Sequence, residues 1–108
     1  MNGTLGALAD PNRLRIVELL RGGPQSVNEI VQKLALTQPL VSKHLRVLRG
    51  TGLVRVRPHA QQRVYELQAG PFEELDTWVS SFRQLWENRL DSLDDYLQDL
   101  KKQKRGRK

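Results

Sequence analysis

The sequence predicts a mainly α-helical fold that contains one small β-hairpin. Up to Gly52 of the 108-residue chain, apolar residues recur with a helical period of three to four residues. Over residues 53–67 the pattern becomes extended and rich in β-branched residues, and over residues 72–100 it is helical again. A chain of this length forms one domain, to which we assign residues 1–100.

The first two helices are predicted from their start and stop signals. A short helix of one or two turns covers about Thr4 to Leu8, and Asp10-Pro11 then provides an N-cap and a first-turn proline for a second helix. Gly22-Gly23-Pro24 ends the second helix. Its expected inward-facing residues are Leu14, Ile16, Val17, Leu19 and Leu20. Its expected water-facing residues are Arg13, Arg15, Glu18 and Arg21.

The next two helices are joined by a very short connection. Ser26 and Glu29 have the spacing of a capping box, which opens the first of them. Ala35-Leu36 then leads to a helix over residues 38–49, for which Thr37 is the expected N-cap. Two helices joined in this way form a helix-turn-helix.

The helix over residues 38–49 has two different faces. One face is an apolar stripe with the spacing i, i+4, i+7, made by Val41, Leu45 and Leu48. The other face carries small, polar and basic groups, contributed by Pro39, Ser42, Lys43 and Arg46. Such a helix suits the major groove of DNA. Since most amphipathic helices are simply solvated on their polar face, this interpretation depends on the rest of the chain.

Two β-rich runs follow, over residues 53–57 and 63–67, and residues 58–62 form the expected polar tip of a hairpin. The hairpin exposes several basic groups, among them Arg57 and Arg63. A basic hairpin directly after a helix-turn-helix is a wing. The predicted fold is therefore a winged helix-turn-helix with five helices and a two-stranded wing, although a hairpin that merely caps a core would look similar.

The last helix carries an apolar stripe that is wider than one intramolecular contact requires. Its large residues include Trp78, Phe82 and Trp86. We expect one edge of the stripe to pack on its own domain and the other edge to pack on the same helix of a second chain. Residues 101–108 are rich in lysine and arginine, have nothing to bury, and are predicted to form a disordered basic tail.

Charge is divided unevenly along the chain, whose formal net charge of +6 favours a polyanionic partner. Residues 1–70 contain ten basic and four acidic side chains, whereas residues 71–100 contain two basic and eight acidic ones. The basic part coincides with the helix-turn-helix and the acidic part with the last helix. The two halves are therefore expected to face different partners.

The composition argues against several classes of protein. The chain has no cysteine, which excludes disulfides and thiolate chemistry. Because it has no glycine-rich phosphate loop, and its acidic segment contains no histidine, we expect neither an enzyme nor a cofactor. No stretch has the apolar length of a membrane span and the N-terminus lacks a signal-peptide pattern, so we expect a cytoplasmic protein without membrane contact.

Three segments of the chain together resemble the ArsR/SmtB-type winged-helix repressors of bacteria. They read LADPNRLRIVELL, QPLVSKHLRVLRGTGLV and RVYEL, and the resemblance extends from about Leu8 to Leu97. It implies a homodimer, joined through its first and last helices, that binds double-stranded DNA at a near-palindromic operator. The expected dimer interface contains Leu5, Leu8, Trp78, Phe82, Trp86 and Leu93.

The resemblance also indicates DNA contacts, residue by residue. The matching positions are Gln38, Pro39, Ser42, Lys43, His44, Arg46, Arg57 and Arg63. Ser42 can donate to a base or accept from it, Lys43 suits guanine O6 and N7, and Gln38 suits adenine. Arg46 is expected to hold phosphate, and the two wing arginines to contact the backbone or the minor groove.

The chain departs from the family pattern where metal is sensed. Metal-responsive members carry a cysteine pair at the start of the third helix, or histidine and aspartate ligands on the last one. The third-helix segment reads Val27-Asn28-Glu29-Ile30 here, and the last helix contains no histidine. We therefore expect no metal site, as in a subgroup that lacks these ligands. A small-molecule effector stays open, because no convergent polar set identifies one.

One alternative function belongs to a different class. Winged helices also serve as scaffolds in protein-interaction adaptors, so the fold alone does not decide between the two roles. The hydrogen-bond donors on the groove-facing side favour DNA.

Overall fold

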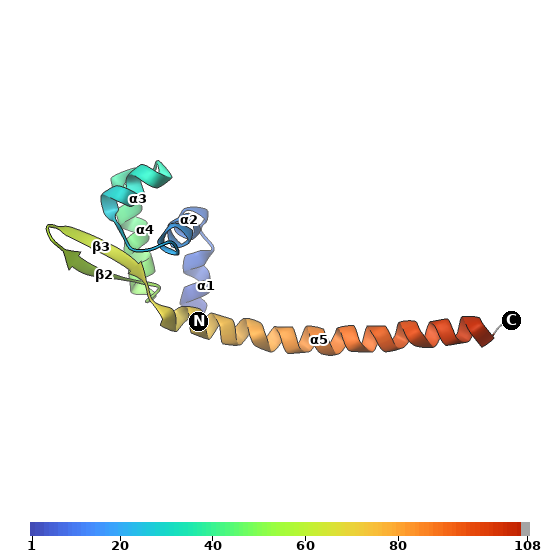
Figure 1. The fold of residues 1–108 in the computed structure, drawn as a ribbon. Coiled ribbons are helices and arrows are strands. Elements are labelled where there is room, and N and C mark those ends of the chain that lie inside the picture. Colours follow the sequence, from blue (N-terminus) through green and yellow to red (C-terminus); the bar gives the residue numbers. More distant parts are fainter. Residues whose placement is uncertain (107–108) are drawn as a thin grey trace. The chain divides into compact units, whose positions relative to one another are not determined.

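The computed structural model describes residues 1–106 and contains five helices and three strands (Figure 1). The helices are α1 (Asn2–Leu8), α2 (Pro11–Leu20), α3 (Val27–Leu34), α4 (Gln38–Gly50) and α5 (Ala69–Gly106). The strands are β1 (Gln25–Ser26), β2 (Val54–His59) and β3 (Gln62–Leu67), which form an antiparallel sheet of order β1-β3-β2. The predicted fold class is confirmed, and β1 adds a short third strand to the wing.

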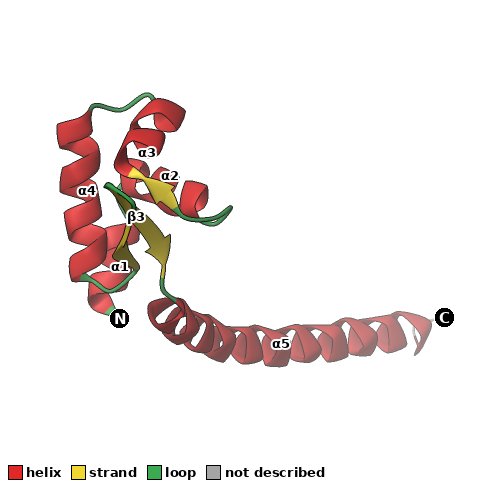
Figure 2. Cartoon of the chain, turned by 60° about the vertical axis from the view of Figure 1, so that its left-hand side comes forward, coloured by secondary structure: helices red, strands yellow, loops and turns green. Residues whose placement is uncertain are grey.

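The chain divides into two compact units, of which the first ends at Glu74 and the second begins at Leu75. In the first unit, the short connection between α3 and α4 is visible at the top of Figure 2. The core of this unit is built from α1, α2, α3, α4 and the start of β2. Its buried side chains are Ala7, Ile16, Val17, Leu20, Ile30, Val41, Leu45, Leu48, Leu53 and Val54.

Asp10 caps α2 as the sequence predicts. Its Oδ1 accepts hydrogen bonds from the backbone N–H groups of Asn12 at 2.8 Å and Arg13 at 3.1 Å. The bond from Arg13 is the largest of the causes that hold the pKa of Asp10 below its usual value of 3.8. Pro11 follows in the first turn, where its missing N–H costs nothing.

The prediction for Arg13 and Leu14 is wrong, because Leu14 is 45% exposed and Arg13 is partly buried. Nε of Arg13 donates to the carbonyl of Ala7 at 2.6 Å, and Nη2 donates to the carbonyl of Gly6 at 3.3 Å. The last carbonyls of a helix have no partner within that helix. The inward-facing guanidinium of Arg13 therefore provides hydrogen bonds to the free carbonyls at the end of α1. On α2, Arg13 faces inward in place of Leu14.

The predicted capping box of α3 is also confirmed. Oγ of Ser26 accepts from the backbone N–H of Glu29 at 3.2 Å, and Oε1 of Glu29 accepts from the backbone N–H of Ser26 at 3.1 Å. The backbone bond from Ser26 holds the pKa of Glu29 below its usual value of 4.5. At the other end, Ala35 adopts a left-handed conformation with φ of 54°, and Arg15 donates to the carbonyl of Leu34 at 2.9 Å.

The hairpin turn is tighter than the expected five-residue tip. His59 pairs with Gln62, so only two residues connect the strands, and Ala60 has a φ of 57°. Pro58 lies within β2, which is an edge strand and tolerates the missing N–H. Figure 1 shows the tip of the hairpin extending beyond the neighbouring helices of its unit.

α5 is one continuous helix of 38 residues and is longer than predicted. It continues through residues 101–106, for which the sequence predicts a disordered tail, while residues 107 and 108 of that tail lie outside the described residues. Lysine, glutamine and arginine have high helix propensity, so this segment continues a helix that is already nucleated. Within the part of the chain that the structure describes, no helix is long and apolar enough to cross a membrane.

Candidate nucleic-acid interface

α4 separates its buried and exposed side chains as the sequence predicts. Its apolar stripe is in the core and is made by Val41, Leu45 and Leu48. The predicted DNA-contacting residues that lie exposed on α4 are Gln38, Pro39, Ser42, Lys43 and Arg46. Pro39 is in the first turn, and Thr37 is the N-cap by position, although its side chain makes no capping hydrogen bond. The exposed set therefore forms one accessible polar and basic face.

His44 belongs to the interior, so the prediction that it contacts DNA is wrong. The residue is 4% exposed, and its Nδ1 lies 3.4 Å from Nη1 of Arg13. Since arginine only donates, Nδ1 is the acceptor in this contact. Nε2 lies 3.9 Å from Oδ1 of Asp10 and has no hydrogen-bond partner among the described residues. His44 shares the buried face of α4 because it stands three residues after Val41.

Strand pairing places the two predicted wing arginines on opposite faces of the hairpin. Arg63 pairs with Pro58, whereas Arg57 pairs with Val64. Because side chains alternate along a strand and paired residues share a face, Arg63 is on the same side as Tyr65. Tyr65 packs against the core, so Arg63 is on the side of the hairpin that faces the helices.

The arginines of the outer face of the wing share one carboxylate. Nε of Arg55 lies 2.5 Å from Oε1 of Glu66, and Nη2 of Arg57 lies 3.6 Å from Oε2 of the same residue. Arg57 is therefore partly neutralised within the hairpin and is less available to an anion than the sequence suggests. Arg63 has no such ion pair among the side chains that the structure describes.

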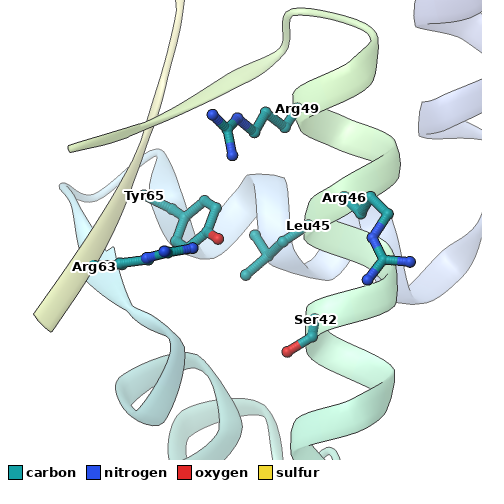
Figure 3. A pocket seen from close by; sticks show the side chains of 6 residues that line it. All are labelled: Ser42, Leu45, Arg46, Arg49, Arg63 and Tyr65. Carbon is teal, nitrogen blue, oxygen red and sulfur yellow. The ribbon is translucent and has the colours of Figure 1, made fainter. Parts of the chain in front are cut away.

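A groove of about 250 Å³ lies between α4 and the wing (Figure 3). It is lined by Ser42, Leu45, Arg46, Arg49, Arg63 and Tyr65. A neighbouring groove of about 330 Å³ is lined by Arg49, Val56, Pro58 and Arg63. Arg49 is not among the residues predicted for this site. Its spacing of seven residues from Ser42 and three from Arg46 is a signal that would have placed it on this face.

A third groove extends the polar surface towards the hairpin tip. Its volume is about 340 Å³, and its lining residues are Ser26, Val27, Asn28, Gln38, Gln61, Gln62 and Arg63. Gln38 is thus joined to the wing by a surface that is rich in amide groups. Among the described residues, no three histidine, cysteine or carboxylate side chains gather closely enough to hold a metal ion.

The residues predicted for the dimer interface differ in their exposure. Leu5 is exposed, whereas Leu8 is half-buried and packs against the core of its own unit. The other four residues are exposed on α5 and are Trp78, Phe82, Trp86 and Leu93. The rings of Trp78 and Phe82 pack edge to face, with their centroids 4.9 Å apart. The guanidinium of Arg89 lies 5.5 Å from the centroid of the Trp86 ring.

Comparisons with known proteins identify the family. The family model described as "Bacterial regulatory protein, arsR family" matches residues 10–56. The HTH-type transcriptional regulator Rv2034 of Mycobacterium tuberculosis is 42% identical over 76 residues, which cover 70% of this chain and 71% of that protein. The transcriptional repressor SdpR of Bacillus subtilis is 27% identical over 90 residues, which cover 83% of this chain and all of SdpR.

Among solved structures, the crystal structure of an ArsR family transcriptional regulator is similar with a TM-score of 0.70. The two proteins are 30% identical, and the similarity covers 80% of this chain and 89% of the other. The identity to Rv2034 over most of both chains and the similarity of the folds agree. The chain therefore belongs to the ArsR family of bacterial transcriptional regulators, which are DNA-binding winged helix-turn-helix proteins and not enzymes.

Proposed function

We propose that this protein is a sequence-specific, dimeric repressor that reads a near-palindromic operator with residues 38–49 of α4 and residues 53–67 of the wing. The observation that carries the proposal is the exposure of Gln38, Ser42 and Lys43 on α4, opposite a fully buried stripe. A helix fixed on one side by the core can present such side chains rigidly to base edges.

Four exposed residues of α4 have proposed roles. Lys43 donates to guanine O6 or N7, Gln38 pairs with adenine, and Ser42 donates to a base or accepts from it. Arg46 holds a backbone phosphate and positions the helix without reading sequence. Arg63 contacts the backbone from the wing, with a smaller contribution from Arg57, which shares Glu66 with its neighbour.

The proposed dimer supports the operator symmetry. The exposed apolar face of α5, together with α1, pairs with the same elements of a second copy. A two-fold pair of subunits then presents two copies of α4 to half-sites about one helical turn apart. The protein acts in the cytoplasm, where it represses transcription by occupying a promoter. SdpR, whose similarity covers 83% of this chain, is itself a transcriptional repressor.

The test is binding of Lys43→Ala to the DNA upstream of the protein's own gene. We expect the substitution to weaken this specific binding by about 1–3 kcal/mol, the cost of one good base contact, and to affect random DNA much less. The measurement is fluorescence anisotropy with both DNAs at a fixed salt concentration, because affinities fall steeply with salt.

Lys33→Ala is the matched control. Lys33 is an exposed lysine of α3 that donates to Oε1 of Gln25 at 2.9 Å, and we expect its replacement to leave both affinities unchanged. Equal affinity of the unmodified protein for its own upstream DNA and for random DNA would refute sequence-specific binding.

A further inference from the structure

Two guanidinium groups from different elements line both grooves between α4 and the wing. Arg49 comes from the last turn of α4, and Arg63 comes from β3. In Figure 3, Arg49 extends from α4 towards the strands, and Arg63 extends from its strand towards α4 beside the ring of Tyr65. Arg46 also lines the smaller groove, but its side chain extends away from the strands in this view. The facing pair is therefore Arg49 and Arg63.

Neither arginine of this pair is neutralised by a carboxylate of the described residues, unlike Arg55 and Arg57 of the wing. Arg55 and Arg57 share the carboxylate of Glu66, whereas neither Arg49 nor Arg63 forms an ion pair within the side chains that the structure describes. Two cations that face the same groove repel each other unless an anion lies between them. The lining of the groove contains no acidic residue that could fill this role.

The remaining lining groups suit a phosphate. Ser42 and Tyr65 provide hydroxyl groups that can donate hydrogen bonds to phosphate oxygens, and guanidinium groups bind phosphate through paired N–H donors. Val56 and Pro58 form an apolar wall beside the two arginines. Across the two neighbouring grooves, Arg49 and Arg63 are therefore accompanied by neutral donors and by a third arginine, Arg46, and no carboxylate competes with an anion there.

We propose that Arg49 and Arg63 together hold one phosphate of the DNA backbone in the groove between α4 and the wing. This inference rests on the proposed function and adds Arg49 to the interface. A phosphate held from both elements fixes how deeply α4 and the wing can enter adjacent grooves. The contact carries no sequence information, because every nucleotide presents the same phosphate.

The test is a double-substitution cycle with Arg49→Gln, Arg63→Gln and the variant that carries both. Affinity for the protein's own upstream DNA and for random DNA is measured at several salt concentrations. Loss of one phosphate contact lowers the slope of log affinity against log salt by about 0.9. On both DNAs, we expect the slope of each single variant to fall by nearly this amount. The slope of the double variant should fall little further, because both side chains hold the same phosphate.

Two further variants sharpen the comparison. Arg21→Gln removes the same charge from an exposed arginine that follows α2 as its C-cap and pairs with Glu18 at 3.4 Å, and we expect its salt slope to equal that of the unmodified protein. Arg49→Lys keeps the charge but loses the paired donors, so we expect an intermediate affinity with a nearly unchanged slope. Thermal unfolding verifies that each variant is folded.

The results separate failure of this inference from failure of the proposed function. If the unmodified protein does not prefer its own upstream DNA, the proposed function fails. If that preference is present but Arg49→Gln changes neither affinity nor slope, only the phosphate site is refuted. Additive losses in the double variant would indicate two separate phosphates, and a changed ratio between the two DNAs would indicate base reading. Either result would overturn the shared site.

A free phosphorylated compound is the other source of the same chemistry. Pyrophosphate is added to the protein without DNA, and the arginine side-chain N–H signals are followed by NMR. We expect only weak, salt-sensitive shifts. Tight pyrophosphate binding that Arg49→Gln abolishes, combined with full DNA affinity of that variant, would assign the groove to a free ligand and overturn the proposal.

Discussion

At the scale of single residues, three polar side chains connect the helices behind the proposed DNA-binding face of α4. Arg13 bonds to carbonyls at the end of α1 and contacts His44 of α4, and Asp10 caps α2 beside the same ring. Because α4 is held from behind by this cluster, its exposed face keeps a fixed orientation relative to α1 and α2. We therefore expect the cluster to support the proposed interface from the interior of the first unit.

His44→Ala tests this supporting role. Removal of a buried ring leaves a cavity, and we expect the free energy of unfolding to fall by about 2 kcal/mol or more. Urea denaturation measures this loss, and DNA affinity is measured under conditions where the variant is still folded. A variant of normal stability with a large loss of DNA affinity would instead make His44 a direct DNA contact.

Asp10→Asn tests the pH dependence of stability. The lowered pKa of Asp10 means that the unfolded chain binds a proton more readily, so this stabilisation is complete above the usual value of 3.8 and is lost as pH falls below it. Asparagine still caps a helix but does not titrate there. We expect urea denaturation to show a smaller loss of stability in the variant between pH 5 and about pH 3.

The stability of the Asp10→Asn variant should still depend on pH, because Glu29 also has a lowered pKa. Its stabilising contribution is lost as pH falls below its usual pKa value of 4.5. An Asp10→Asn protein whose stability falls with acid as steeply as that of the unmodified protein would contradict the assignment.

The sequence predicts the roles of residues that interact with near neighbours in the chain, but not the roles of residues whose partners are distant in the chain. Asp10, Pro11 and the Ser26–Glu29 pair were found because capping depends on residues two or three positions away. Arg13 was expected in water since its type is usually exposed, but its partners are the carbonyls of another helix. Residue type alone cannot reveal such a partner.

At the scale of elements, the hairpin and α5 show where sequence patterns have limits. The β-rich runs located β2 and β3, but the two-residue turn depends on a left-handed Ala60 that has no glycine to mark it. β1 consists of two residues and exists through its pairing with β3, which no local pattern encodes. The groove between α4 and the wing likewise arises only when the two elements pack.

Leu93→Lys tests the role of α5 as the dimer element. Leu93 is exposed in the single chain, and a charge at the centre of an apolar helix pair is strongly unfavourable. We expect the unmodified protein to sediment as a dimer at micromolar concentration and the variant to sediment as a monomer. Leu14→Lys places the same charge on an exposed leucine of α2 and should leave the dimer intact.

A monomeric unmodified protein would contradict the dimer. Dissociation of both leucine variants would show that the added charge, and not its position on α5, causes the effect.

At the scale of the whole molecule, the charge distribution matches two separate tasks. The first unit contains the basic α4 and wing, whereas the helix of the second unit is acidic through residue 100 and exposes a row of large apolar side chains. The first unit suits a polyanion and the second suits a like helix. The sequence predicts the change in charge near Gly70-Pro71, but it assigns residues 1–100 to one domain and does not predict the boundary between Glu74 and Leu75.

DNase I footprinting on the DNA that flanks the protein's own gene tests the central claim most directly. The account predicts protection of two symmetric half-sites about 10 base pairs apart, centre to centre, because two copies of α4 would enter successive major grooves. It also predicts that a folded Ser42→Ala, Lys43→Ala double variant loses this protection. No protected region, or the same footprint with the double variant, would contradict the account.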